Sequence, residues 1–251
     1  MSRSLVSPRG FTHGLRVLKR VFLDDQFERK SQLIALSPES LNAAYTPEIV
    51  LPPRRHIEKP GGQTLEGLVF LAGLVRALDV KAAFEIGTFD GVTTWTLARN
   101  MRAGVVDTLD LPAGEPTELA LEDTDEEVRS LLSGHVYDDL PHPASIEQHW
   151  GDSASFDFSA WSGRCDLVYI DGAHSEPYVE SDTRNAFAML SGRGAIVWDD
   201  YWRLVHGVPK VLHGLAAPRP RRVPGTRLAV HLTPKAEAHM TRSGTQPSSN
   251  Y

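Results

Sequence analysis

The sequence of 251 residues predicts a doubly wound α/β fold, an open and mostly parallel sheet with helices on both faces. Two observations lead to this prediction. An apolar run ends in a glycine turn that opens a helix at Phe84–Gly91, and further along the chain two apolar runs end in aspartate and enclose a helical stretch. A strand-helix-strand unit of this length places two parallel strands side by side through a right-handed crossover.

The first 60 residues are expected to form an N-terminal helical addition followed by a linker. Apolar residues between Leu15 and Phe27 recur at helical spacing with basic residues around them. Prolines and glycines between Pro52 and Gly62 mark the linker. A helix is then expected over Thr64–Leu78, near the start of a main domain that spans residues 61–235.

The glycine turn follows the first expected strand, Lys81–Ile86. Gly87 lets the backbone bend and approach a ligand closely, and Gly91 begins the next helix. Glu85 lies at the carboxyl end of the strand, where open parallel sheets bind ligands. Taken alone, the turn is equally compatible with a tight strand-to-helix connection.

Two further strands are expected at Val105–Asp110 and Ile146–Trp150, with an acidic insertion at residues 111–145 between them. The insertion leaves the carboxyl end of the second strand, where long loops most often form lids or specificity elements. We therefore expect the insertion, together with the N-terminal addition, to cover a binding pocket. The alternative is a solvated acidic helix that packs outside the pocket.

The two aspartate-ended strands come next, one beginning at Cys165 and the other at Gly194. Residues 177–190 between them have the spacing of an amphipathic crossover helix. Asp171 and Asp199 are 199 − 171 = 28 positions apart. Because parallel neighbours end at the same edge of a sheet, both aspartates are expected to emerge beside Glu85.

The last part of the chain predicts a helix near residues 208–215 and a final strand at residues 226–232. This strand alternates as an antiparallel edge strand does. Residues 219–222 are unusually basic for a strand, so the order of the sheet stays open there. The tail at residues 236–251 contains Ser, Gly and Pro and is expected to be flexible.

The composition is that of a globular protein, with 41% hydrophobic and 23% charged residues. Its single cysteine, Cys165, excludes an intramolecular disulfide and a cysteine-based zinc cluster, which fits a cytoplasmic location. No transmembrane segment and no secretory segment is found. The formal net charge of −6 argues against a nucleic-acid partner. The sequence leaves a homo-oligomer open.

With these motifs, residues 61–232 resemble the class I S-adenosylmethionine-dependent methyltransferases, most closely the small O-methyltransferase-like group with an IDGAH strand end, here residues 170–174. The resemblance implies a Rossmann-like methyltransferase sheet that binds S-adenosylmethionine. It implies that the glycine turn cradles the methionine part of the cofactor, that an acidic residue holds the ribose hydroxyls, and that a Gly-Asp-Ser turn contacts the adenine. The implied cofactor-binding residues are Glu85, Gly87, Gly91, Asp110, Asp152 and Ser153.

The same resemblance implies metal ligands, because in the metal-dependent catechol-type branch acidic residues after the fourth and fifth strands bind a divalent cation. Asp171, Asp199 and Asp200 match these positions. Three carboxylates at one edge repel one another unless a cation or protons neutralise them, and oxygen ligands favour Mg²⁺ or a similar divalent cation. No other neutralising group is apparent in the sequence. Alternatively, Asp199 and Asp200 form a solvated pair and Asp171 caps a helix.

Asp110 has its own physical argument, since it lies 110 − 87 = 23 positions beyond Gly87. One carboxylate can accept hydrogen bonds from both hydroxyls of a ribose, which explains an acidic residue about 20 positions after a glycine turn. The alternative is that Asp110 and Asp152 only cap turns at strand ends.

The combined prediction is an enzyme that moves a methyl group from S-adenosylmethionine to a hydroxyl oxygen of a small molecule, with help from a divalent cation. The candidate catalytic residues are Asp171 and His174. His174 is expected to act as a general base, with a metal-site neighbour or an ordinary loop histidine as alternatives. A nicotinamide-dependent dehydrogenase is disfavoured because residues 87–91 lack a second closely spaced glycine. A non-catalytic cofactor-binding partner protein is the third interpretation.

Overall fold

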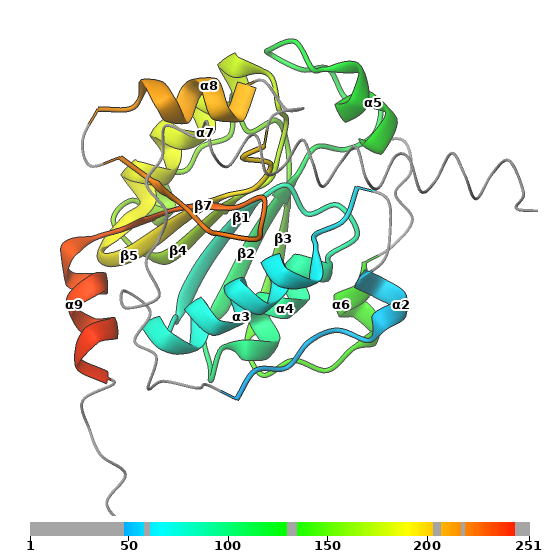
Figure 1. Ribbon diagram of the computed structural model, residues 1–251. Coiled ribbons are helices and arrows are strands. Elements are labelled where there is room, and N and C mark those ends of the chain that lie inside the picture. The colour runs from blue at the N-terminus through cyan, green and yellow to red at the C-terminus, as the bar shows by residue number, and fades with distance from the viewer. Residues whose placement is uncertain (1–47, 58–60, 130–134, 203–206, 217–218, 244–251) are drawn as a thin grey trace, which may run out of the picture.

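The computed structural model describes residues 48–57, 61–129, 135–202, 207–216 and 219–243 (Figure 1). The helix predicted between Leu15 and Phe27 lies outside the described residues, and so do residues 244–251. A short helix, α2 at Arg54–Ile57, precedes the main fold. None of the helices in the described part combines the length and the apolar character that a membrane crossing requires.

A single seven-stranded sheet forms the centre of the fold, in the order β3-β2-β1-β4-β5-β7-β6. The first five strands in this order run parallel, and β7 runs antiparallel to β5. The doubly wound, mostly parallel sheet is therefore confirmed. Its strands are β1 Ala82–Ile86, β2 Val105–Asp110, β3 Ser145–Trp150, β4 Cys165–Ile170, β5 Leu190–Trp198, β6 Arg221–Arg222 and β7 Ala229–Leu232.

The prediction that the final strand forms the edge is wrong, because β7 lies between β5 and β6. The basic residues Arg221 and Arg222 form the edge strand β6, which is two residues long. Charged side chains suit this position because an edge strand meets solvent on one side.

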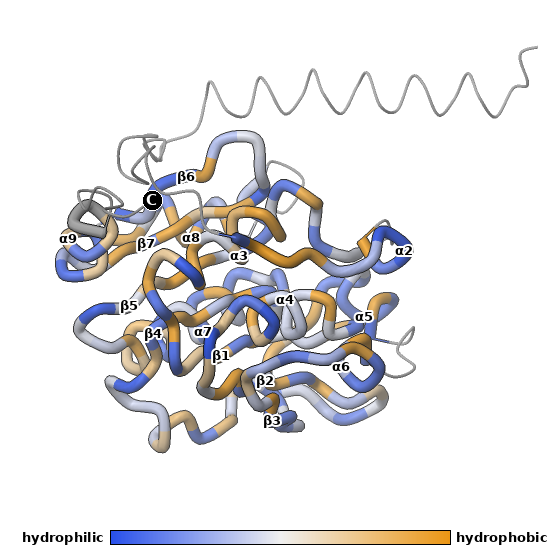
Figure 2. The backbone as a smooth tube through the Cα atoms, turned by 90° about the horizontal axis from the view of Figure 1, so that it is seen from below, coloured by the Kyte–Doolittle hydropathy of each residue, from blue (hydrophilic) through white to orange (hydrophobic). Residues whose placement is uncertain are grey.

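Helices cover both faces of the sheet (Figure 1). Alternate strand residues point to opposite faces, so Leu167 and Tyr169 pack into one core while Val168 and Ile170 pack into the other. The helices α3 Leu65–Leu78, α4 Val92–Asn100 and α9 Pro234–Ser243 belong to the first core. The helices α7 Glu176–Met189 and α8 Gly207–Gly214 belong to the second. Figure 2 shows hydrophobic stretches along these segments.

Two boundaries differ from the sequence prediction. Helix α7 ends at Met189 and β5 begins at the next residue, so the strand starts four positions before Gly194. The tail predicted to be flexible from residue 236 begins inside α9, where Ala236 and Met240 are buried against the first core. Because these two side chains are four positions apart, they lie on the same face of the helix.

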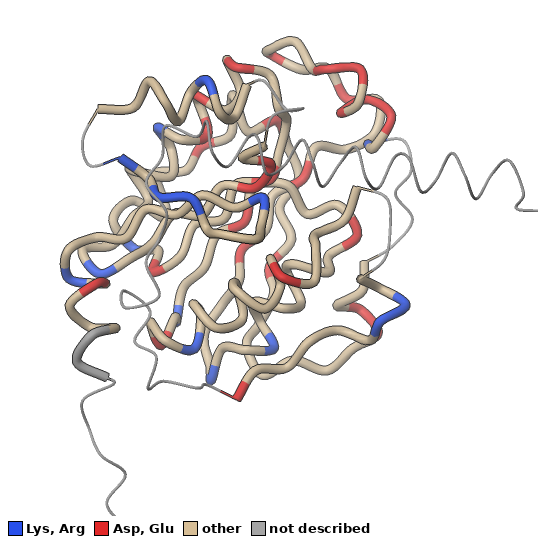
Figure 3. Tube along the Cα trace, viewed as in Figure 1, with Lys and Arg blue, Asp and Glu red and all other residues tan. Residues whose placement is uncertain are grey.

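The acidic insertion carries two short helices, α5 Asp123–Arg129 and α6 Val136–Asp139. Helix α6 lies against α4, and the backbone nitrogen of Val136 donates to the carbonyl of Asp90. Helix α5 lies on the side of the carboxyl ends of the strands, and Figure 3 shows the acidic residues that gather along it. The insertion thus starts on the ligand side of the sheet, where α5 lies, and ends at the opposite edge, where β3 begins beside the start of β2.

The turn after β1 fits tightly against the end of β4. Gly87 has φ +96°, and a Cβ atom at this position would lie 2.1 Å from the carbonyl oxygen of Asp171. The nitrogen of Gly87 donates to Leu109, and the nitrogen of Asp171 donates to Ile86. Only glycine combines this backbone conformation with such a close approach.

Glu85 is fully buried beneath this turn. Its Oε2 atom accepts hydrogen bonds from the hydroxyls of Thr94 in α4 and Thr108 in β2. Burial raises the pKa of Glu85 to about 8, although the two hydroxyls lower it. Glu85 therefore links β1, β2 and α4 as a group that holds its proton at neutral pH.

The replacement Gly87→Ala is expected to lower the free energy of unfolding by roughly 2–4 kcal/mol, since strain and a backbone clash add together. Gly163→Ala provides a matched control, because Gly163 has φ +68° but open space around it. The control is expected to cost about 1–2 kcal/mol. Urea unfolding of both variants measures the difference. Equal losses would show that the contact with Asp171 imposes no constraint.

Glu85 also predicts a pH dependence of stability. Between pH 4.5 and about 8 the unfolded chain releases the proton of Glu85 while the folded chain keeps it, so this group's contribution to stability falls as the pH rises. The stability of the wild type relative to Glu85→Gln is expected to fall over this range by on the order of 1 kcal/mol per pH unit. Glu147→Gln, at an exposed glutamate of β3, controls for the loss of a carboxyl group. A constant difference between pH 5 and 8 would contradict the burial of the proton.

Candidate active site

A cavity of about 400 Å³ opens at the carboxyl edge of the sheet. Its volume is in the range of pockets that hold small molecules. Seven of the residues singled out in the sequence line it, namely Gly87, Asp110, Asp152, Ser153, Asp171, His174 and Asp200. Glu85 and Gly91 do not line it, since Glu85 lies beneath the turn and Gly91 faces the ring of Tyr137. Asp199 lies beside the cavity but is buried.

Asp110 lies at the end of β2, at one side of the cavity. Its Oδ1 atom accepts a hydrogen bond from the nitrogen of Leu111, whereas its Oδ2 atom is buried without a partner among the described residues. Burial raises the pKa of Asp110 to about 6, against the backbone N–H groups of Leu111, Thr88 and Phe89, which lower it. A buried acceptor without a partner on a cavity wall is suited to hydrogen bonds from a ligand.

Asp152 lines the cavity, and its carboxylate already has several hydrogen-bond partners within the protein. Its carboxylate accepts hydrogen bonds from the nitrogen of Ala154, the nitrogen of Glu118 and the hydroxyl of Tyr178. These bonds fix the turn after β3, the insertion and α7 relative to one another. The carboxylate of Asp152 caps a turn, and Ser153 beside it lines the cavity.

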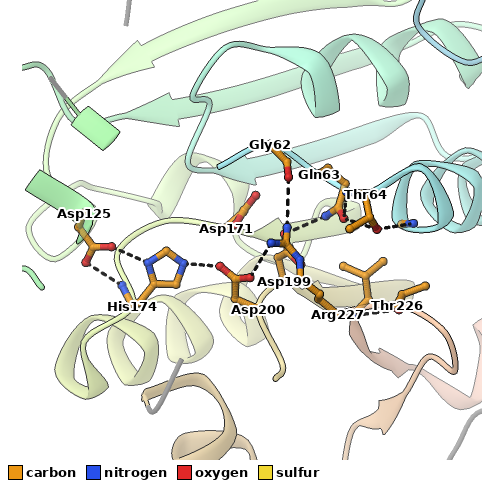
Figure 4. A network of polar contacts seen from close by, with 12 residues as sticks. Gly62, Gln63, Thr64, Asp125, Asp171, His174, Asp199, Asp200, Thr226 and Arg227 are labelled. Atoms are coloured by element: carbon orange, nitrogen blue, oxygen red, sulfur yellow. Dashed lines mark hydrogen bonds and ion pairs between the residues drawn. The ribbon is translucent and has the colours of Figure 1, made fainter. Parts of the chain in front are cut away.

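The opposite side of the cavity is acidic, as the close view in Figure 4 shows. Asp171 follows β4, and Asp199 and Asp200 follow β5, so the parallel strands bring them to one edge as expected. Asp200 has φ +53°, a conformation that is uncommon for a residue with a Cβ atom. We call Asp171, Asp199 and Asp200 the acidic edge.

Arg227 lies among these carboxylates, although the sequence analysis did not single it out. Its Nη2 atom lies 2.9 Å from Oδ2 of Asp199, and its Nη1 atom lies 3.2 Å from Oδ1 of Asp200. Trp198 pairs with Ala229, so two residues further along the same register Asp200 lies opposite Arg227. Because β7 is antiparallel, it brings its first residues to the edge where the parallel strands end.

The signal for Arg227 was therefore present in the sequence. An antiparallel strand was expected at residues 226–232, and a charged residue at its start belongs to the carboxyl edge of the sheet. Gln63 was also missed. Its Nε2 atom donates to Asp199 and to the hydroxyl of Tyr169, each at 2.8 Å. It precedes α3, and no sequence motif marks it.

His174 is held between two carboxylates (Figure 4). Its Nδ1 atom lies 2.5 Å from Asp125 of the insertion, and its Nε2 atom lies 2.8 Å from Asp200. Burial alone would lower the pKa of His174, but the bonds to Asp125 and Asp200 raise it to about 11. Both ring nitrogens lie against carboxylates, which favours the charged form of the ring, and the expected role of His174 as a general base stays a prediction.

Asp171 differs from its neighbours because no cation pairs with it directly among the described residues. Its Oδ2 atom accepts a hydrogen bond from the hydroxyl of Tyr169 at 3.1 Å. Burial, and then the charges of Asp199 and Asp200, raise the pKa of Asp171 well above its ordinary value. This carboxyl group therefore binds a proton more strongly than an exposed aspartate does.

The donor atoms that converge come from two of the predicted metal ligands, Asp171 and Asp200, and from His174. Single atoms of Asp171, His174 and Asp200 lie within 4.8 Å of one another, whereas Asp199 is not part of this group. Asp199 is held by Arg227 and Gln63, and His174 is charged and has no free lone pair. Two protein cations, Arg227 and His174, therefore already pair with carboxylates of the acidic edge, and binding of a divalent cation there stays a prediction.

The insertion forms part of the cavity wall. Residues 121, 122, 124, 125, 128 and 129 of the segment that contains α5 line it, and so does Leu111. Asp125 also accepts a hydrogen bond from the backbone nitrogen of His174 at 3.1 Å. Trp202, beyond the acidic edge, lines the cavity as well.

Several solved structures are similar to this chain. They include cofactor-bound Rv0187 from MTB, with 20% identity over 78% of this chain and 86% of that chain and a TM-score of 0.46. TomG, an O-methyltransferase from Streptomyces achromogenes in complex with SAM, has 16% identity, coverage of 84% and 97%, and a TM-score of 0.43. The SAH-bound methyltransferase PaMTH1 of Podospora anserina has 13% identity, coverage of 97% and 86%, and a TM-score of 0.41.

No curated protein matches the sequence. Residues 84–201 match the family model described as a methyltransferase domain. This segment runs from β1 to the acidic edge and contains Asp110, Asp171 and His174, whereas Gln63 and Arg227 lie outside it. Residues 84–201 of the chain are therefore similar to a methyltransferase domain.

Proposed function

We propose that the chain transfers a methyl group from S-adenosylmethionine to a hydroxyl oxygen of a small molecule. The observation that carries this proposal is the cavity, which joins the unpartnered carboxylate oxygen of Asp110 to the acidic edge within a methyltransferase domain. This reaction requires a hydrogen-bond acceptor for the ribose hydroxyls of the cofactor. It also requires a group that takes the proton of the acceptor hydroxyl.

The residues around Asp110 fit the nucleoside part of the cofactor. Ionised Asp110 would accept hydrogen bonds from the two ribose hydroxyls. Gly87 and Ser153 line the same side of the cavity, and Leu109 and Leu111 offer apolar surface. Glu85 and Gly91 would act indirectly, because they shape the turn without lining the cavity.

Bound in this cavity, S-adenosylmethionine would supply an electrophilic methyl group on a positively charged sulfur. The acidic edge would stabilise that positive charge through its carboxylates. Asp171 would take the proton of the acceptor hydroxyl while the new carbon–oxygen bond forms and the carbon–sulfur bond breaks. Burial and the neighbouring carboxylates raise the pKa of Asp171 above its ordinary value, which strengthens it as a proton acceptor on the cavity wall.

His174 has a positioning role in this proposal. Its charged ring joins Asp125 of the insertion to Asp200 of the acidic edge. This connection would hold α5 over the cavity and orient Asp200. No step of the proposed reaction passes through a divalent cation, because the cationic positions are taken by Arg227 and His174.

The acceptor is proposed to be small. The segment that contains α5 closes one wall of the cavity and brings acidic side chains to it. Negative charge repels the phosphates of nucleic acids, and an enclosed cavity excludes large acceptors.

Asp110→Asn is expected to weaken binding of S-adenosylhomocysteine about tenfold or more, because a hydrogen bond to a charged group is worth about 1.5–3 kcal/mol. The wild-type affinity is expected to rise with pH as Asp110 ionises near pH 6 and then to level off. Calorimetry between pH 5 and 8 measures both effects, with exposed Asp139→Asn as the control. Wild-type protein that binds NAD and does not bind S-adenosylhomocysteine would refute the cofactor assignment.

Asp171→Asn is expected to slow methyl transfer by about 10²–10⁴-fold and to leave the affinity for S-adenosylhomocysteine nearly unchanged. The reason is that the substitution replaces the proton-accepting carboxylate with an amide and leaves the ribose side of the cavity unchanged. Transfer of labelled methyl groups to a panel of small hydroxylated molecules measures the rate, and Asp139→Asn again serves as control. The wild-type rate should rise with pH as Asp171 ionises. An unchanged rate in Asp171→Asn would assign proton removal to another group.

A further inference from the structure

Arg227 is the cation with direct ion pairs to both Asp199 and Asp200 among the described residues (Figure 4). Its side chain is 18% exposed, and the residue lines the cavity. A guanidinium group stays charged at every pH of interest and offers five donors in a fixed plane. It can therefore hold two carboxylates and still present positive charge to a bound molecule.

The backbone fixes Arg227 in this position. Residues 223–226 form a tight turn in which the nitrogen and the hydroxyl of Thr226 both bond to the carbonyl of Val223. The carbonyl of Arg227 then accepts a hydrogen bond from the nitrogen of Tyr201, next to the acidic edge. The backbone at Arg227 is therefore held in place independently of the ion pairs that its side chain forms.

The atoms that Arg227 binds belong to two of the three predicted metal ligands, Asp199 and Asp200. Oδ2 of Asp199 accepts hydrogen bonds from Arg227 and Gln63. Oδ1 of Asp200 forms an ion pair with Nη1 of Arg227. A divalent ion beside Arg227 would place like charges a few ångströms apart in a partly buried site, which costs several kcal/mol at an effective dielectric constant near 20. The guanidinium therefore disfavours a divalent ion at Asp199 and Asp200.

We propose that Arg227 takes the place of a divalent cation at the acidic edge, so that the site is complete without metal. Its guanidinium neutralises Asp199 and Asp200 and faces the oxygen of the acceptor. The claim that Arg227 faces the oxygen of the acceptor rests on the proposed function. The claim that Arg227 replaces a metal ion rests on the geometry of the acidic edge alone.

The test uses Mn²⁺ as the probe and electron paramagnetic resonance to measure bound and free ion in the full-length protein. The wild type is expected to retain no stoichiometric Mn²⁺. Arg227→Gln removes the charge and leaves the carboxylates for oxygen-liganded metal, so its affinity for Mn²⁺ should increase at least about tenfold. Arg227→Lys keeps the charge and should bind Mn²⁺ as poorly as the wild type. Arg164→Gln, at the exposed residue before β4 and thus at the opposite end of the sheet, is the matched control.

Stoichiometric binding of Mn²⁺ by the wild type that disappears in Asp200→Asn would overturn the proposal. A folded Arg227→Gln protein with no gain in affinity would also overturn it, because the carboxylates would then not form a cation site at all. If Arg227→Gln does not fold, the wild type, Arg227→Lys and Asp200→Asn still decide the question. Calorimetry with S-adenosylhomocysteine on the same preparations is independent of this result, so a failure of the proposed cofactor would be seen separately.

Discussion

The compensation of buried negative charge at one edge of the sheet is the constraint on which this structure depends. Parallel strands end together, so β4 and β5 necessarily bring Asp171, Asp199 and Asp200 into one place. Two unit charges 4 Å apart interact by about 4 kcal/mol at an effective dielectric constant of 20. Without compensation the edge would either spread apart or bind protons. The fold compensates with Arg227, which lies two residues before β7, and with His174, which Asp125 of the insertion holds in turn.

This compensation also connects parts of the chain that are far apart in sequence. Arg227 joins the end of β5 to the start of β7, Gln63 joins the start of α3 to Asp199, and Asp125 joins the insertion to the loop after β4. The other side of the cavity is tied in a similar way by Asp152, which holds the insertion and α7. Hydrogen bonds and ion pairs therefore connect the cavity wall to distant parts of the chain on both sides. Asp110 and Asp171 remain as the acidic groups with capacity for a ligand.

Much of the fold could be predicted because periodicity and turn residues report local structure. The alternating and continuous apolar runs indicated the strands, and the glycine turn indicated the start of α4. The predictions failed where packing decides. The short edge strand β6 exists because β7 offers a free backbone, and α9 forms because Ala236 and Met240 find a core to bury in. The residues that pair with β6 and those that pack against α9 cannot be identified from the sequence of either segment alone.

By itself, the sequence determined the doubly wound sheet, the glycine turn and the convergence of the acidic residues, because all three follow from strand direction and local backbone preferences. Only the tertiary structure decided what those residues do. It left Asp110 with an unpartnered oxygen, used Asp152 to cap a turn, and placed the guanidinium of Arg227 where a metal ion was expected. The physical reason is that the charge state and the free capacity of a carboxylate depend on which distant groups surround it, and those distances are set by packing.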